Sequence, residues 1–153
     1  MVATSVEGNV QLVTFKLGQE EYGIDIMQVR EIIKLVPITR IPGAAATVEG
    51  VMELRNEIIP VVDLRSTFGI DGVPGIESRI IVVSVNSTTI GLMVDAVSEV
   101  LRLRQDSIEP LPDVVKVSLS TSNCVRGVAR LDKRLVLVVD LDRLLSDVLA
   151  LTA

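Results

Sequence analysis

Two aspartates occupy equivalent places in two similar stretches of the chain. Asp63 lies in the run VVDL at 61–64, and Asp140 lies in the same run at 138–141. Two carboxylates that share one proton can activate water, as in aspartic proteases. That chemistry requires Thr or Ser and then Gly after each aspartate, whereas Leu-Arg and Leu-Asp follow here and begin helical patterns. We therefore predict that both aspartates cap helix N-termini.

Other catalytic chemistry has few candidate side chains. The chain contains no histidine, which removes the usual general base at neutral pH and the commonest metal ligand. Its single cysteine, Cys124, has no histidine partner to activate the thiol, so we interpret it as a small apolar core residue. We therefore expect no enzyme, no metal and no cofactor, although measured turnover would reopen an enzymatic interpretation.

Composition and charge narrow the class of partner and the compartment. The formal net charge of −5 opposes binding to a polyphosphate backbone, so we expect no nucleic-acid partner. No apolar run approaches the roughly 18 residues that span a bilayer, and residues 1–9 lack the pattern of a signal peptide. One cysteine cannot form an internal disulfide. We expect a cytoplasmic protein without direct membrane insertion.

The chain contains an internal duplication. Residues 50–64 return as residues 127–141, at a spacing of 77, with seven of the fifteen identical. Residues 22–34 match 90–102 more faintly, at a spacing of 68. Two halves of about 60 residues would each bury only about 60% of their unfolded surface. We therefore expect two related halves that pack against each other.

The elements that position the candidate residues are mostly strands. Forty residues are Val or Ile and only three are aromatic, and such β-branched enrichment in short runs indicates an all-β fold. The repeated unit predicts a hairpin of strands 51–54 and 58–62 joined at Arg55-Asn56-Glu57, because Asn56 tolerates the positive φ of a tight turn. Apolar spacing over 141–151 predicts an amphipathic C-terminal helix.

Arg55 is the charged residue that this pattern presents most clearly, at the exposed hairpin tip. An ordinary solvated turn residue is the simpler interpretation, and the residues alone favour it. Val29, Ile32 and Ile33 have an equally simple interpretation as core of the first half. They would form a binding surface only if a face of their strand were exposed.

Several motifs of the chain resemble the CheW family of chemotaxis coupling proteins. The resemblance runs from about residue 10 to the C-terminal helix and is carried by QEEYGIDI (19–26), TRIP (39–42), VEGV (48–51), LR (54–55), IIPVVDLR (58–65), VSLST (117–121) and GV (127–128). The resemblance implies two tandem SH3-like five-stranded barrels. We accordingly expect one CheW-like domain over 1–153, with a first barrel over about 10–70, a second over about 79–141 and a C-terminal helix over 142–153.

The resemblance also implies a function and a site. It implies a non-catalytic adaptor that joins the cytoplasmic tip of a chemoreceptor, a methyl-accepting chemotaxis protein, to the regulatory domain of a CheA-type histidine kinase. The adaptor would be recruited to membrane-associated receptor arrays. The family's receptor-binding positions correspond here to Val29, Glu31, Gly50 and Arg55. Arg55 would pair with a receptor carboxylate, Gly50 would allow close backbone approach, and Val29 would give apolar contact. No kinase-binding residue follows from the motifs.

One departure and one alternative accompany this interpretation. The family usually has Asn-Leu-Arg-Gly at the hairpin, and this chain has Glu53-Leu54-Arg55-Asn56, which brings a carboxylate within two residues of Arg55. The alternative function is a small β-barrel module that binds nucleic acid or a ligand. Such a module would be expected to carry basic stripes and stacking aromatics, which net acidity and three aromatic residues do not supply.

Overall fold

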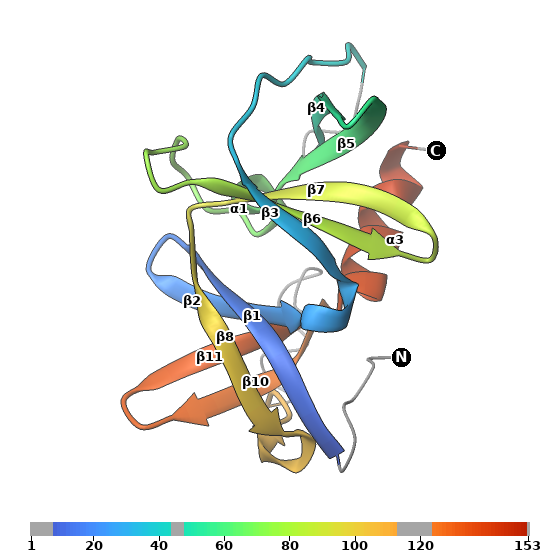
Figure 1. Cartoon of the computed structure of the whole chain (residues 1–153). Helices are drawn as coiled ribbons and strands as arrows, with labels where there is room; N and C mark the ends of the chain where they lie inside the picture. The colour runs from blue at the N-terminus through green and yellow to red at the C-terminus, as the bar shows by residue number, and fades with distance from the viewer. Residues whose placement is uncertain (1–7, 44–47, 113–123, 153) are drawn as a thin grey trace.

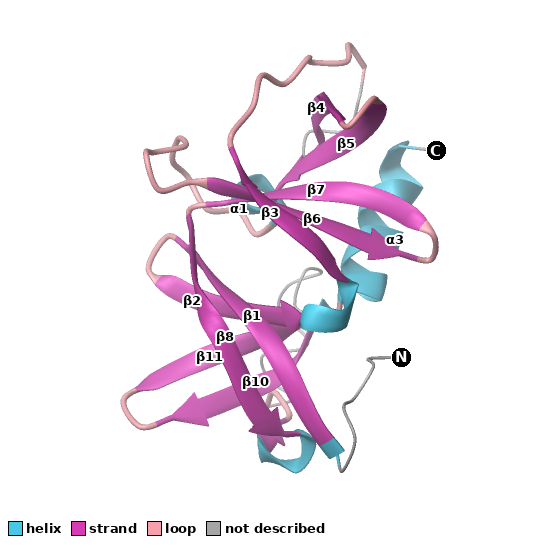
Figure 2. Cartoon of the chain, viewed as in Figure 1, coloured by secondary structure: helices cyan, strands magenta, loops and turns pink. Residues whose placement is uncertain are grey.

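The structure is a computed structural model that describes residues 8–43, 48–112 and 124–152. Strands dominate it, and helical segments are short apart from the one at the C-terminus (Figure 1, Figure 2). The elements in chain order are β1 (Asn9–Leu17), β2 (Glu20–Asp25), the 3₁₀ turn η2 (Ile26–Gln28), β3 (Val29–Lys34), β4 (Val48–Leu54), β5 (Glu57–Asp63), α1 (Leu64–Thr67), β6 (Arg79–Val85), β7 (Thr88–Val94), β8 (Ala96–Arg104), the 3₁₀ turn η3 (Gln105–Ser107), β9 (Ile108–Glu109), β10 (Val125–Leu131), β11 (Arg134–Val139) and α3 (Leu141–Thr152).

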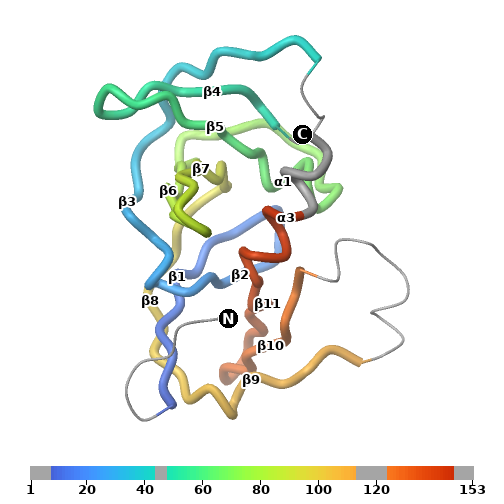
Figure 3. Tube along the Cα trace, turned by 90° about the vertical axis from the view of Figure 1, so that its right-hand side faces the viewer, coloured from blue at the N-terminus to red at the C-terminus, as the bar shows by residue number. Residues whose placement is uncertain are grey.

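The strands form two sheets, so the predicted all-β class with a C-terminal helix is confirmed. One sheet has five strands in the order β3-β6-β7-β5-β4, and the other has six in the order β8-β1-β2-β11-β10-β9. Helix α3 begins one residue before the predicted start at 142, and residue 153 lies outside the described residues. In two views α3 runs from the junction of the sheets toward the five-stranded sheet (Figure 1, Figure 3). No helix in the described parts of the chain has the length and hydropathy to cross a membrane.

The predicted barrel boundaries at 10–70 and 79–141 do not coincide with the sheets. The five-stranded sheet is one continuous segment, β3 to β7, whereas β1 and β2 join the strands from β8 onward to make the six-stranded sheet. Each repeat therefore contributes its first hairpin to the sheet that the other repeat completes. Two parallel ladders make this exchange possible, because β2 pairs with β11 and β7 pairs with β5.

The exchanged ladders have the same register, which supports the duplication read from the sequence. Gly23 on β2 is opposite Val138 on β11, and Gly91 on β7 is opposite Val61 on β5. The two glycines are 68 residues apart and the two valines 77 apart, which are the two spacings of the repeat. A register match at this level is expected of duplicated units, because a slip of one residue would turn every side chain to the other face.

The chain that leaves the edge strand of each sheet returns to its other edge. After β3, Thr39 pairs with Val51 of β4 through two backbone hydrogen bonds of 2.8 Å. After β8, Glu109 of β9 pairs with Val128 of β10. Val51 and Val128 are repeat equivalents, so both sheets curl and close in the same way.

Among the described residues, one hydrophobic cluster joins the two sheets, and each sheet also has a smaller cluster of its own. The cluster that joins the sheets, the shared core, includes Phe15 and Tyr22 of the six-stranded sheet together with Val62 and Leu92 of the five-stranded sheet and Leu144 of α3, all nearly inaccessible to solvent. The three aromatic residues of the chain form one stack: the ring centroids of Phe15 and Tyr22 are 5.8 Å apart and those of Tyr22 and Phe68 are 5.1 Å apart. The expected packing of the two halves against each other is thus realised through a shared interior.

Polar contacts fix the points where helices begin and where the chain changes sheet. The Asp63 carboxylate accepts from the backbone N–H of Arg65 at 3.0 Å, and Asp140 accepts from that of Arg143 at 3.3 Å, so both predicted N-caps are confirmed. Asp95, between β7 and β8, accepts from the N–H of Gly18 at 2.7 Å and from Arg65 Nη1 at 2.5 Å. This carboxylate therefore ties the β1–β2 turn of one sheet to α1 beside the other.

Candidate protein-docking site

The tip of the β4–β5 hairpin is a two-residue turn. Leu54 pairs with Glu57, and the residues between them, Arg55 and Asn56, have φ values of 51° and 67°. Two consecutive left-handed residues are typical of the tight hairpin turn whose twist matches the flanking strands. The predicted hairpin and the positive φ of Asn56 are confirmed. The turn places Arg55 at the tip of the hairpin.

The Arg55 guanidinium binds the carboxylate of Glu31 on β3. Arg55 Nη2 donates to Glu31 Oε1 at 2.8 Å and Arg55 Nε donates to Oε2 at 3.1 Å. The hydrogen bond from Arg55 lowers the pKa of Glu31, and the same bond raises the pKa of Arg55. Strands β3 and β4 are at opposite edges of the five-stranded sheet, so this pair bridges the two edges of the curled sheet.

The internal partner of Arg55 is thus a residue that the resemblance placed in the same site. Glu53 of β4 is nearer to Arg55 in the sequence, but the guanidinium pairs with Glu31. The Arg55 side chain remains 73% exposed, whereas that of Glu31 is 28% exposed. Only two of the five guanidinium donors are used in the pair, so Arg55 can bind a second carboxylate while it keeps Glu31.

Val29 and Glu31 lie on either side of a β-bulge in β3, because Val29 is opposite Val83 of β6 and Glu31 is opposite Val82. Val29 is half-buried and packs against the shared core, so its apolar contact is partly internal. Arg30, Ile32 and Lys34 alternate with the half-buried residues of β3 and are exposed. Ile32 is 42% exposed, so an exposed apolar residue lies between two cations along β3.

Gly50 is buried, and the close backbone approach that it allows is to its own chain. Its φ is +156°, and a Cβ at this position would lie 2.1 Å from the carbonyl oxygen of Thr39. Gly127, its repeat equivalent, has the same function, because a Cβ there would lie 2.4 Å from the carbonyl oxygen of Glu109. Both glycines are at register shifts where the returning chain crosses the edge strand. Gly50 therefore closes its own sheet, and its predicted contact with a receptor stays a prediction.

The family model of the CheW-like domain matches residues 11–149. The chain belongs to the CheW family. A chemotaxis protein CheW of Klebsiella aerogenes is 38% identical over 137 residues, covering 89% of this chain and 81% of that protein. A chemotaxis protein CheW of Rhizobium meliloti is 38% identical over 136 residues, covering 88% of this chain and 86% of that protein. The crystal structure of the scaffolding protein TtCheW from Thermoanaerobacter tengcongensis superposes with a TM-score of 0.79 at 39% identity, covering 88% of this chain and 91% of that chain.

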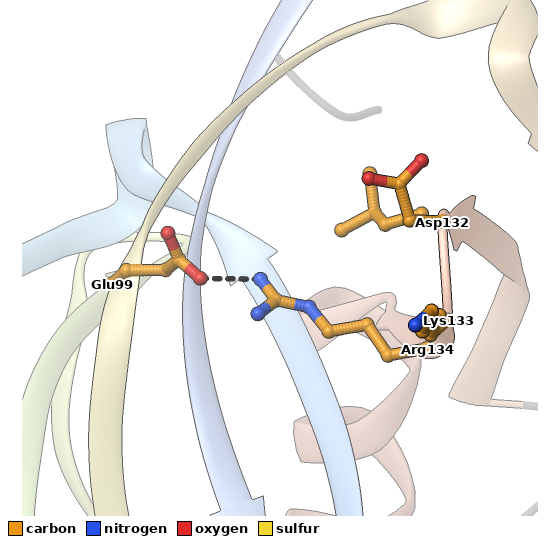
Figure 4. A pocket seen from close by; sticks show the side chains of 5 residues that line it. Glu99, Asp132, Lys133 and Arg134 are labelled. Carbon is orange, nitrogen blue, oxygen red and sulfur yellow. Dashed lines mark hydrogen bonds and ion pairs between the residues drawn. The ribbon is translucent and has the colours of Figure 1, made fainter.

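This CheW-family chain has a second arginine–glutamate pair beside the β10–β11 hairpin of the six-stranded sheet. Glu99 on β8 is the repeat equivalent of Glu31, and it pairs with Arg134 at the start of β11 (Figure 4). Arg134 also binds Glu21 of β2 at 3.3 Å. A hollow of about 700 Å³ lies beside the pair, lined by Glu99, Leu131, Asp132, Lys133 and Arg134.

The two arginine–glutamate sites differ at the tip of the hairpin. Asp132 takes the place of Arg55 in the second repeat, and a carboxylate there cannot pair with Glu99. The pairing arginine is instead two residues further on, on the strand and not in the turn. The repeat spacing of 68 could have identified Glu99 from the sequence, but Arg134 corresponds to Glu57 and no pattern marks it. Within the described residues, no group of three or more His, Cys, Asp and Glu side chains could hold a metal ion.

Proposed function

We propose that this protein is a non-catalytic adaptor that couples the cytoplasmic tips of chemoreceptors to a CheA-type histidine kinase. The observation that carries the proposal is the match of the CheW-like domain over nearly the whole chain, 11–149, together with relatives whose names place them in chemotaxis or call them scaffolding proteins. The adaptor is cytoplasmic and is recruited to membrane-associated receptor arrays. The alternative of a nucleic-acid or ligand-binding module has no comparable support.

The receptor site in this proposal consists of Arg55, Glu31 and Val29. Arg55 binds a receptor carboxylate with the guanidinium donors that Glu31 leaves unused, and Glu31 orients the guanidinium by holding Nε and Nη2. Bidentate arginine–carboxylate geometry gives the contact direction as well as attraction. Val29, two residues before Glu31, contributes half-buried apolar surface. Gly50 supports the site from within, because it keeps β4 against Thr39 and so keeps the hairpin at its angle.

The kinase surface in this proposal is the end of the six-stranded sheet at the β10–β11 hairpin. Its hollow and the Glu99–Arg134 pair lie on the sheet that does not carry Arg55 (Figure 4). Two partners bound at the same time need two separate surfaces, and the two sheets supply one each. The exposed Leu135 beside Arg134 offers apolar contact area there, with 57% of its surface accessible.

Titration calorimetry of the purified chain tests the proposal. The partners are the cytoplasmic tip of a chemoreceptor from the same cell and, separately, the regulatory domain of its histidine kinase. We expect binding to both with a Kd of about 1 µM or tighter, which corresponds to about −8 kcal/mol. Binding to the kinase domain alone would contradict the receptor assignment, and binding to neither would contradict the adaptor function.

A further inference from the structure

The chain passes from the five-stranded sheet to the six-stranded sheet at Asp95, the one residue between β7 and β8 (Figure 1). Its backbone N–H donates to the carbonyl oxygen of Lys16 at 3.0 Å, and its carboxylate accepts from the N–H of Gly18 at 2.7 Å. Both partners belong to the β1–β2 hairpin, so Asp95 is anchored to the six-stranded sheet.

Arg65 joins Asp95 to the five-stranded sheet. It is the second residue of α1, which follows β5 directly, and its Nη1 donates to Asp95 Oδ1 at 2.5 Å. Its Nη2 donates to the backbone carbonyl of Asp71 in the loop after α1. The Arg65 and Asp95 side chains are 17% and 20% exposed, and salt screens a partly buried ion pair less than one on the surface. The guanidinium therefore connects α1, its loop and the crossing.

The guanidinium occupies a position that is costly for the arginine itself. Its Nε is buried and, in the described parts of the chain, donates to no acceptor. A buried N–H without a partner has lost its hydration and has gained no hydrogen bond in return. Gly72 leaves room for the group, because a Cβ there would overlap Nη2, Cζ and Nε of Arg65. Stability alone would favour a placement in which every buried donor is paired, so the link to Asp95 explains this position better.

The other crossing has an equivalent link with different chemistry. At the repeat spacing of 77, Arg65 corresponds to Asp142, the second residue of α3. Asp142 Oδ1 accepts from Gln28 Nε2 at 3.2 Å, and Gln28 ends η2, which connects β2 of the six-stranded sheet to β3 of the five-stranded sheet. In each repeat, the helix after the second hairpin therefore holds the crossing segment of the other repeat. Opposite charges form the link at Asp95, whereas a longer hydrogen bond from a neutral amide joins Gln28 to Asp142.

We propose that Arg65 and Asp95 are positioning residues that set the angle between the two sheets, and thereby the geometry in which one partner is presented to the other. The inference rests on the proposed function, because an adaptor with one docking surface on each sheet couples its partners only while those surfaces keep their orientation. Apolar packing in the shared core resists separation of the sheets, whereas a directional arginine–carboxylate pair fixes an angle. Neither residue belongs to the proposed receptor site or kinase surface, so losing the link should disturb coupling and leave each binding site intact.

Distances between spin labels on the two sheets test the first part of the inference, in the full chain without a partner. Thr88 of β7 and Arg102 of β8 are exposed, so nitroxide labels on a Thr88→Cys, Arg102→Cys background report how the sheets are related, while the native Cys124 is buried. We expect one narrow distance distribution in this background, a broader one with Arg65→Ala, and a narrow one again with Arg65→Lys, which keeps a cation for Asp95. An unchanged distribution with Arg65→Ala would overturn the inference.

Gly72→Ala is a second variant, and it retains both charges of the link. Its Cβ would displace the Arg65 guanidinium, so it should broaden the distance distribution as Arg65→Ala does. The matched control is Arg79→Ala, because the Arg79 guanidinium donates to the carbonyls of Ile76 and Ser78 within the same loop, and the distribution should then stay narrow. Equal broadening with Arg79→Ala would attribute the effect to the loop and would overturn the inference.

Receptor-dependent stimulation of the kinase in a reconstituted complex tests the second part. Arg65→Ala should bind the receptor tip and the kinase regulatory domain, each alone, within about twofold of the wild type. Stimulation in the complex of all three should fall at least about fivefold, the lower end of usual coupling between two sites, and Arg65→Lys should restore most of it. Full stimulation with Arg65→Ala would overturn the coupling role and leave the proposed function standing. A wild type that binds neither partner would refute the proposed function and the coupling role with it, while the distance measurement would still decide whether Arg65 holds the sheets.

Discussion

Replacing Gly50 by alanine is the most direct test of how the five-stranded sheet closes. The new Cβ would lie 2.1 Å from the Thr39 carbonyl oxygen, whereas ordinary contacts begin at 3.4 Å. Thr39 would have to move by roughly 1 Å, which breaks its two 2.8 Å hydrogen bonds with Val51. Two backbone hydrogen bonds contribute about 1–3 kcal/mol, and a side chain at φ +156° adds about 1 kcal/mol of strain.

The expected loss in the free energy of unfolding is therefore about 3 kcal/mol. For a chain of this length, each kcal/mol corresponds to about 2–4 °C in Tm, so Gly50→Ala should melt roughly 6–12 °C below the wild type in a circular-dichroism scan. Gly127→Ala should have a similar effect, because its Cβ would meet the Glu109 carbonyl. Gly75→Ala is the matched control, since no atom lies within 4 Å of its Cβ, and its Tm should stay within about 2 °C.

The binding measurement separates a structural role for Gly50 from direct contact. At a temperature where Gly50→Ala is folded, it should bind the receptor tip within about threefold of the wild type, a factor worth less than 1 kcal/mol. A variant that melts with the wild type would refute the steric argument. A variant that is fully stable and has lost receptor binding would restore the direct contact that the family resemblance implied.

Three further predictions concern charged residues. The exchange Glu31→Arg with Arg55→Glu should keep the internal pair and the wild-type Tm but abolish calorimetric binding of the receptor tip, because the charge at the hairpin tip is inverted; retained binding would exclude Arg55 as the carboxylate-binding group. Arg55 lowers the pKa of Glu31 below its ordinary 4.5, so the pair should stabilise the fold above about pH 4.5 and cease to do so as the pH falls through the folded-state pKa. The Tm difference between wild type and Glu31→Gln should therefore vanish in acid. A Tm difference that grows in acid would contradict this sign. Asp63→Ala removes the cap on Arg65 N–H and should cost about 1 kcal/mol in urea denaturation; an unchanged unfolding midpoint would show that the cap contributes nothing.

Much of the local structure could be predicted because it depends on near neighbours in the sequence. The hairpin at Arg55-Asn56, the caps at Asp63 and Asp140 and the apolar stripe of α3 each follow from a few adjacent residues. The barrel boundaries could not be predicted in this way. Sequence similarity shows that two units are related, but it does not show whether β1 and β2 pair within their own repeat or with β8 and β11.

The same distinction between local patterns and contacts of distant residues applies to the candidate site. Arg55 could be located from the hairpin pattern, but its partner Glu31 is 24 residues away and meets it only because the five-stranded sheet curls. The contact of Gly50 with its own chain could not be predicted for a related reason, since the segment that crosses it contains Thr39, at a separation in the sequence that no local pattern encodes.

The exchange of hairpins has a mechanical consequence for an adaptor. The chain passes between the sheets at two places, η2 and Asp95, and each crossing is fixed by side-chain hydrogen bonds: Gln28 to Asp142 at the first, and Asp95 to Gly18 and Arg65 at the second. The shared core lies between the crossings and includes residues from both sheets. A large apolar interface of this kind opposes relative motion of two units. Two surfaces carried on the two sheets therefore keep a fixed distance and angle, which is the property that coupling by geometry requires.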